Sequence, residues 1–164
     1  MGQYFEGNTV IVGAYGEDTG ATNAGAAYIF VKSGSTWTEQ AKIQATDKAA
    51  SDFFGMVVSI SDDGNTAIVS APYKDIGAND TGAAYIFTRS GSTWAQQAKI
   101  QASDAQASDY FGYSVSISSD GNTAIVGANS EDTGAGGAGT SFFSLSQSSK
   151  FFSQIFLIIA FKYG

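Results

Sequence analysis

The segment SDYFGYSVSISSDGNTAIVGA, residues 108–128, repeats the earlier segment SDFFGMVVSISDDGNTAIVSA, residues 51–71, with few changes. Asp52 aligns with Asp109, which sets a period of 57 residues (109 − 52). The same period relates further identical residues of successive units: Trp37 and Trp94, Tyr28 and Tyr85, and Asn8, Asn65 and Asn122. A fixed period of this length is typical of solenoids, propellers and arrays.

Each unit is predicted to form four short strands. Residues 112–118 alternate apolar and polar side chains, whereas TAIVGA at 123–128 is a short apolar run, typical of a strand buried on both faces. Residues 83–88 and 93–102 form the third and fourth strands of the middle unit. Alternation in the fourth strand is expected to place five side chains on one face: Trp94, Gln96, Ala98, Ile100 and Ala102. No segment has a sustained helical period, so the fold is predicted to be all-β.

Four antiparallel strands per unit, with small residues in the middle strands, are typical of a β-propeller blade. We therefore expect a partial β-propeller of about three four-stranded antiparallel blades, with the first and the last incomplete or degenerate. Residues 1–52 would form a truncated first blade, 53–109 a complete second blade, and 110–164 a third blade with a degenerate C-terminal half.

The C-terminal part departs from the repeat after Gly139, but large side chains persist at the same period. Phe142 takes the place of Tyr85, Phe151 of Trp94, Gln154 of Gln97 and Leu157 of Ile100. Two interpretations remain open: the tail forms a degenerate hairpin, or it is a frayed end.

Composition excludes several classes of function. The chain of 164 residues has 8 basic and 15 acidic residues and a net charge of −7, which disfavours nucleic acid as a partner because phosphates would be repelled. It contains neither Cys nor His, so thiolate chemistry and imidazole catalysis are excluded. Residues 155–161, IFLIIAF, are far shorter than the roughly 20 apolar residues that span a bilayer, and we expect no membrane insertion. The first residues show no secretory signal.

The repeated motifs resemble the FG-GAP repeat family, which forms the β-propeller of integrin α subunits and of many bacterial and protist surface proteins. Phe-Gly opens a unit, and a Gly-Ala-Pro-like triplet follows its second strand. The matching residues are Phe54, Gly55, Phe111, Gly112, Gly13, Ala14, Ala71, Pro72, Gly127 and Ala128. The resemblance implies an extracellular or cell-surface location and a parent ring of seven blades. Barely three blades cannot close such a ring, so we expect a fragment, an open partial propeller, or a subunit completed by further blades or by self-association.

The resemblance also raises the question of calcium, which such blades bind through an Asp-x-Asp-x-Asp-Gly loop. Calcium takes about six to eight oxygen ligands. The corresponding loops in this chain, 61–66 and 118–123, supply only Asp62 and Asp63, or Asp120 alone. This pattern is incomplete, and we expect tight turns and no cofactor.

A second set of acidic residues recurs in the loop after the second strand of each unit. The candidates for ligand binding are Asp18, Asp75 and Asp132, with Glu17 and Glu131 beside them. Each aspartate precedes a glycine by two residues, which favours an Asx-type turn in which the carboxylate accepts local N–H groups. The alternative is that these loops line one rim of the propeller and bind a partner.

Trp37 and Trp94 hold one fixed strand position, which favours a core role over a ligand-stacking role. Acidic pairs recur in every unit, whereas a catalytic pair normally occurs once, so we expect no enzyme activity. The leading hypothesis is a module for protein or glycan binding and adhesion. The alternatives are a purely structural repeat fragment and the non-catalytic part of an FG-GAP-bearing hydrolase.

Overall fold

The computed structural model describes residues 7–130, 141–146 and 159–161, and these form strands joined by turns and loops. The strands of the first two sheets are β1 (Thr9–Ala14), β2 (Ala26–Ser33), β3 (Thr36–Ile43), β4 (Val58–Ile60), β5 (Thr66–Ala71), β6 (Ala83–Ser90) and β7 (Thr93–Ile100). Those of the third sheet are β8 (Ser114–Ile117), β9 (Thr123–Ala128), β10 (Ser141–Ser146) and β11 (Ile159–Phe161). The all-β prediction is confirmed. Within these ranges, no helix is long and apolar enough to cross a bilayer.

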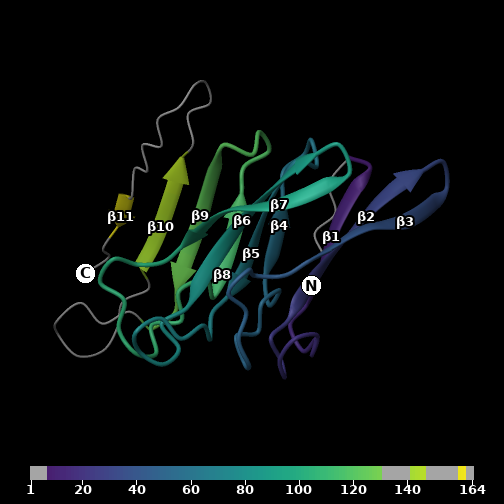
Figure 1. Cartoon of the computed structure of the whole chain (residues 1–164). Helices are drawn as coiled ribbons and strands as arrows, with labels where there is room; N and C mark the ends of the chain where they lie inside the picture. The colour runs from purple at the N-terminus through teal and green to yellow at the C-terminus, as the bar shows by residue number, and fades with distance from the viewer. Residues whose placement is uncertain (1–6, 131–140, 147–158, 162–164) are drawn as a thin grey trace.

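Three antiparallel sheets stand side by side as successive blades (Figure 1). Blade 1 has the order β1-β2-β3, blade 2 the order β4-β5-β6-β7, and blade 3 the order β8-β9-β10-β11. Each is a meander in which neighbouring strands follow one another along the chain. The predicted arrangement of antiparallel blades is confirmed.

Strand β5 shows how the blades pack against one another, because its side chains alternate between two apolar interfaces. Ala67, Val69 and Ala71 pack toward blade 1, whereas Ile68 packs toward blade 3. The two interfaces are separate hydrophobic clusters, and the core of the described residues lies in them. Because this strand is buried on both faces, its side chains are mostly apolar on both and do not alternate between apolar and polar.

A β-bulge in the outermost strand corrects one prediction. Ile86 pairs with Ala98 but Phe87 pairs with Gln96, so Gln97 is left between two paired residues. The extra residue reverses the alternation: Trp94 packs on the blade 1 side, while Ala98 and Ile100 pack on the blade 3 side. The expectation that Trp94, Gln96, Ala98, Ile100 and Ala102 share one face was therefore wrong.

Of the two interpretations of the tail, the pairing of β10 with β11 supports the hairpin, but with a register that differs from that of blade 2. Phe142 pairs with Phe161, whereas its counterpart Tyr85 pairs with Lys99. The pairing partner of this position thus lies 62 residues further on (161 − 99) and not 57. The residues expected to match those of the fourth strand, Phe151, Gln154 and Leu157, lie outside the described residues.

The two tryptophans occupy equivalent positions with different burial. Trp37 pairs with Lys32 and Trp94 with Arg89, and in each case the cation lies 5.9 Å from the indole ring. Trp94 packs against blade 1 and its Nε1 donates to Oε1 of Gln40 (3.0 Å). Trp37 is 41% exposed, since it lies on the outer face of blade 1. The core role predicted for both is confirmed for Trp94 and wrong for Trp37.

Each linker between blades binds to the loop of the blade that it leaves. In the first linker, N–H groups donate to carbonyl oxygens in three pairs: Ser51 to Thr22 (2.8 Å), Phe53 to Asn23 (3.1 Å) and Phe54 to Ala24 (3.1 Å). The same bonds recur one period later: Ser108 to Asn79 (2.9 Å), Tyr110 to Asp80 (3.0 Å) and Phe111 to Thr81 (2.9 Å). The Phe-Gly motif is thus the start of one blade held by its predecessor.

This joint requires glycine. Gly25 forms a parallel bridge with Phe54, as Gly82 does with Phe111. A Cβ atom at Gly82 would lie 2.2 Å from the carbonyl oxygen and 2.4 Å from the nitrogen of Phe111. The φ angle of Gly82 is also +84°, a conformation that favours glycine.

Candidate functional site: a rim of loops and aromatic side chains

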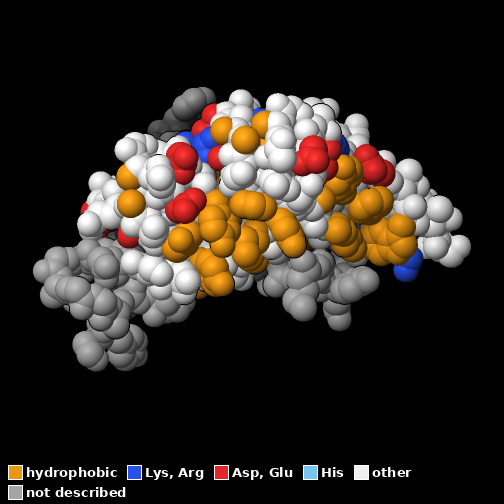
Figure 2. Space-filling view, turned by 90° about the horizontal axis from the view of Figure 1, so that it is seen from below, with side chains coloured by type: hydrophobic (Ala, Val, Ile, Leu, Met, Phe, Trp, Pro, Cys, Tyr) orange, Lys and Arg blue, Asp and Glu red, His pale blue; other side chains and the backbone are white. Residues whose placement is uncertain are grey.

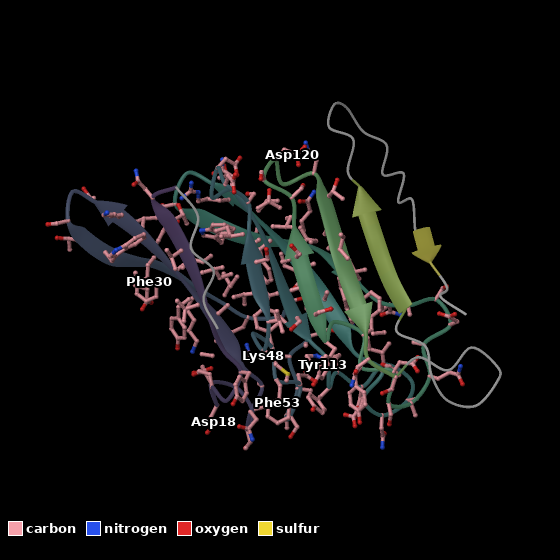
Figure 3. All side chains as sticks on the ribbon, turned by 180° about the vertical axis from the view of Figure 1, so that it is seen from behind. Asp18, Phe30, Lys48, Phe53, Tyr113 and Asp120 are labelled. Atoms are coloured by element: carbon pink, nitrogen blue, oxygen red, sulfur yellow. The ribbon has the colours of Figure 1, made fainter. Side chains whose placement is uncertain are left out.

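The loops that follow β1 and β5, and the linkers that enter blades 2 and 3, gather at one end of the molecule. We call this end the rim; it comprises residues 15–25, 44–57, 72–82 and 101–113. In Figure 3, Asp18, Lys48, Phe53 and Tyr113 lie at this end, whereas Asp120 lies at the opposite end. The rim is built on the ends of buried strands, so a rigid scaffold positions its side chains.

The two described aspartates of the repeated loop have the predicted turn role. Oδ1 of Asp18 accepts the N–H of Asn23 (2.7 Å), and Oδ1 of Asp75 accepts the N–H of Asp80 (2.8 Å). In both loops the carboxylate spans five residues and closes the loop on itself. Asp132 and Glu131 lie outside the described residues.

A row of aromatic rings crosses the rim, and the sequence did not reveal it. The ring centroids of Tyr15 and Phe53 are 6.0 Å apart, those of Phe53 and Tyr73 are 5.1 Å apart, and those of Tyr73 and Tyr110 are 5.3 Å apart. Tyr15 is 54% exposed and the other three rings are half-buried. We call these four residues the aromatic row. Figure 2, which views the molecule from below, shows hydrophobic side chains gathered on this face with acidic side chains beside them.

The row gives no periodic signal because its members hold three different positions of the repeat. Phe53 and Tyr110 are equivalent, but Tyr15 aligns with Pro72, and Tyr73 aligns with Gly16. The only sequence feature that pointed to the row is the first aromatic residue of the Phe-Phe-Gly and Tyr-Phe-Gly motifs. The second aromatic residue of each motif, Phe54 or Phe111, is buried, whereas the first, Phe53 or Tyr110, lies at the surface.

Backbone strain supports a special role for these two residues. The φ angle is +52° at Phe53 and +53° at Tyr110, a left-handed conformation that is uncommon for bulky side chains. Such conformations cost about 1–3 kcal/mol each and persist where surrounding structure enforces them. In this chain the linker hydrogen bonds enforce them, and the two rings contact Tyr73 from either side.

Glu17, a predicted ligand-binding residue, is engaged by its own blade. Its Oε1 lies 2.8 Å from Nζ of Lys42, and its Oε2 accepts the N–H of Thr19 (3.0 Å) and Nε2 of Gln44 (3.1 Å). The hydrogen bonds from Lys42 and then Thr19 lower the pKa of Glu17 to about 2, and the Glu17 carboxylate raises the pKa of Lys42. Glu17 therefore stays ionised and holds the outer strand β3 against the rim loop.

Blade 2 replaces this pair with a buried ion pair that the sequence did not predict. Nζ of Lys74, which is buried, lies 2.8 Å from Oδ2 of buried Asp52 and donates to the carbonyl oxygen of Asp47 (2.5 Å). The Asp47 carboxylate in turn accepts Nζ of Lys99 (2.8 Å) and the hydroxyl of Tyr85 (2.9 Å). We call these five residues the linker cluster, since they fasten the first linker to blade 2. Lys74 aligns with Glu17 and Glu131. This reversal of charge in one unit is the sequence feature from which a different ion pair in blade 2 could have been predicted.

The linker cluster should make stability depend on pH. Burial alone would raise the pKa of Asp47, but the hydrogen bonds from Lys99 and Tyr85 outweigh it and lower that pKa below its ordinary value of 3.8. A depressed carboxyl pKa stabilises the folded state above about pH 4, and this contribution is lost as pH falls through the folded value. We expect Asp47→Asn to lower the urea midpoint at pH 7 and to differ less from the native chain below about pH 4.

Urea unfolding between pH 7 and pH 2 measures this effect. For Lys99→Met the difference in urea midpoint from the native chain should likewise become smaller below about pH 4, because this variant removes one of the two side-chain partners of Asp47. A difference between native chain and Asp47→Asn that stays constant over the whole pH range would contradict the assignment.

The turns at the end opposite the rim match their predicted role. Oδ1 of Asp63 accepts the hydroxyl of Ser61 (2.6 Å) and the N–H of Asn65 (2.9 Å), and its Oδ2 accepts the side-chain amide of Asn65 (3.0 Å). Asp120 makes the same bonds with Ser118 and Asn122. Both carboxylates are thus occupied within their own turns. Within the described residues, no three acidic side chains gather where they could hold a metal ion.

Comparison with known protein families gives a match across the three units. The model of the FG-GAP repeat matches residues 5–30, 37–87 and 94–142, which is more than half of the chain. The second and third matches begin at Trp37 and Trp94, one period apart. No curated protein matched the chain.

Proposed function

The chain belongs to the FG-GAP repeat family, and from this premise we propose that it is a non-enzymatic binding module that holds a protein or glycan on its rim. The observation that carries the proposal is the aromatic row, which continues from blade 1 to the entry of blade 3. Tyrosine and phenylalanine are enriched at binding surfaces, because they offer a large apolar contact at a low cost in conformational entropy.

The surroundings of the row favour binding over catalysis. Four acidic side chains of the rim have structural roles: Asp18 and Asp75 close turns, and Glu17 and Asp52 hold lysines. The row itself has rings tilted at 54° to 68° to one another, which presents both ring faces and ring edges to a ligand. Such a surface suits apolar faces of sugars and extended peptides. An adhesive role at the cell surface or outside the cell is part of this proposal, and it rests on the family membership.

The test removes rings without disturbing the backbone. Asparagine tolerates the left-handed conformation of Phe53 and Tyr110, so Phe53→Asn with Tyr110→Asn deletes two rings and adds little strain. Native chain and double variant are compared on a glycan array and against displayed peptides. Ligands of the native chain are expected to bind the double variant about tenfold or more weakly, as is usual for central aromatic contacts.

Trp37→Ser is the matched control, because it removes an exposed aromatic ring that lies on β3 and outside the rim. This variant should keep the affinity of the native chain. The proposal fails if no glycan or peptide is retained, or if the double variant binds the retained ligands as well as the native chain does.

A further inference from the structure

The outer face of blade 1 exposes the side chains that blade 2 buries at the same positions of the repeat. Val69 and Tyr85 of blade 2 are fully buried against blade 1, and Phe87 is 3% exposed. Their equivalents in blade 1 are Val12, which is 38% exposed, and the half-buried Tyr28 and Phe30. In Figure 3, Phe30 lies on the outer side of the first sheet. We call Val12, Tyr28, Phe30 and Trp37 the leading face.

The outer face of blade 3 exposes the isoleucine that blades 1 and 2 bury at the same position of the repeat. Ile11 of blade 1 and Ile68 of blade 2 are both fully buried, each in the cluster shared with the following blade. The equivalent residue of blade 3 is Ile125, which is 46% exposed in the middle of β9. We call Ile125, with the exposed Ser114 and Ser116 of the neighbouring strand β8, the trailing face.

We propose that the trailing face of one copy of this chain packs on the leading face of a second copy, in the manner in which blade 1 packs on blade 2. The blade interfaces inside the chain are the basis for choosing this occupant. The interface between blades 1 and 2 shows which surfaces fit each other: the face of blade 1 that contains Ile11 packs on the valine, tyrosine and phenylalanine of blade 2. The contact between copies would continue that series with the same side chains.

The proposed contact is head-to-tail, because the two faces differ. An interface of this kind joins unlike surfaces and extends to rings or to open chains of subunits. Each copy carries a net charge of −7, so copies repel one another. Raising the ionic strength should therefore strengthen the association. The proposal is independent of ligand binding at the rim, since neither face contains a member of the aromatic row.

Two variants that each block one face test the direction of the contact. Val12→Lys blocks the leading face and Ile125→Lys blocks the trailing face, and both residues are exposed enough for a lysine stem to reach solvent. Ser92→Lys adds the same charge to an exposed turn of blade 2 and is the control. Sedimentation velocity measures the mass over a range of concentrations.

The native chain and Ser92→Lys are expected to form species larger than the 17.0 kDa of one chain as concentration rises. Each blocked variant alone should remain at that mass. An equimolar mixture of the two should form a species of twice that mass and no larger one, because one intact leading face and one intact trailing face remain.

Three results would overturn the proposal: a native chain that stays monomeric, a blocked variant that associates alone, or a mixture that does not combine. Circular dichroism establishes that each variant is folded. If a lysine variant is not folded, Val12→Thr and Ile125→Thr replace it, since threonine suits strands and still reduces the apolar area. These variants should then require higher concentrations than the native chain for association.

Discussion

Gly82→Ala is expected to destabilise the protein by about 3–4 kcal/mol, because two costs coincide at this residue. Holding a non-glycine residue in a left-handed conformation costs about 1–2 kcal/mol. The added Cβ would also lie 2.2 Å from the carbonyl oxygen of Phe111, so the joint between blades 2 and 3 must open. Forcing extra atoms into a packed site typically costs a further 1–3 kcal/mol, roughly. Urea unfolding followed by tryptophan fluorescence measures the loss.

Gly77→Ala is the matched control, because the same loop offers a glycine with the same backbone constraint and no steric one. Its φ angle is +76° and nothing lies within 4 Å of the position of a Cβ atom. We expect Gly77→Ala to cost about 1–2 kcal/mol. Equal losses for the two variants would show that close approach of the backbones contributes nothing to the joint.

Lys74→Met is expected to cost about 3–5 kcal/mol, since removing one partner of a buried ion pair leaves the other charge unpaired. Asp52 is 3% exposed, and its Oδ2 accepts both the ammonium group of Lys74 (2.8 Å) and the N–H of Ala49 (2.6 Å). The variant keeps the second of these bonds and loses the first, which carries the compensating charge. The loss is measured as the shift in the urea midpoint at pH 7, multiplied by the slope of the transition.

The double variant Lys74→Met with Asp52→Asn serves as the control for this prediction. Removing both charges avoids the unpaired carboxylate, so the double variant should be more stable than Lys74→Met alone. If the two variants are equally unstable, lysine contributes through packing and not through its charge.

The sequence predicted the parts of the fold that depend on local pattern. Strand β9 has the predicted bounds, Thr123–Ala128, because a short apolar run between two turn motifs leaves little choice. The turn role of Asp18 and Asp75 followed from the aspartate–glycine spacing alone. The number and order of the blades followed from the period, since a repeated segment in a repeated environment adopts the same structure.

What could not be predicted depends on single extra residues and on contacts between units. The bulge at Gln97 reverses the alternation of β7, yet the composition around it is that of an ordinary strand. Trp37 and Trp94 lie in nearly identical local sequences, so the greater exposure of Trp37 reflects the packing of blade 1 and could not be predicted from its local sequence. The aromatic row joins residues from three repeat positions, and the linker cluster joins Lys74 to a partner 22 residues earlier, so neither gives a periodic signal.

The linker hydrogen bonds make the middle unit, residues 53–109, a module that is joined to a neighbour at each end. Its Phe-Gly motif binds the glycine loop of blade 1, and its own glycine loop binds Phe111 at the start of blade 3. A tandem copy spliced in between would therefore meet both neighbours through joints that already exist. An array of such units can therefore gain or lose whole 57-residue units while the contacts at each junction stay the same.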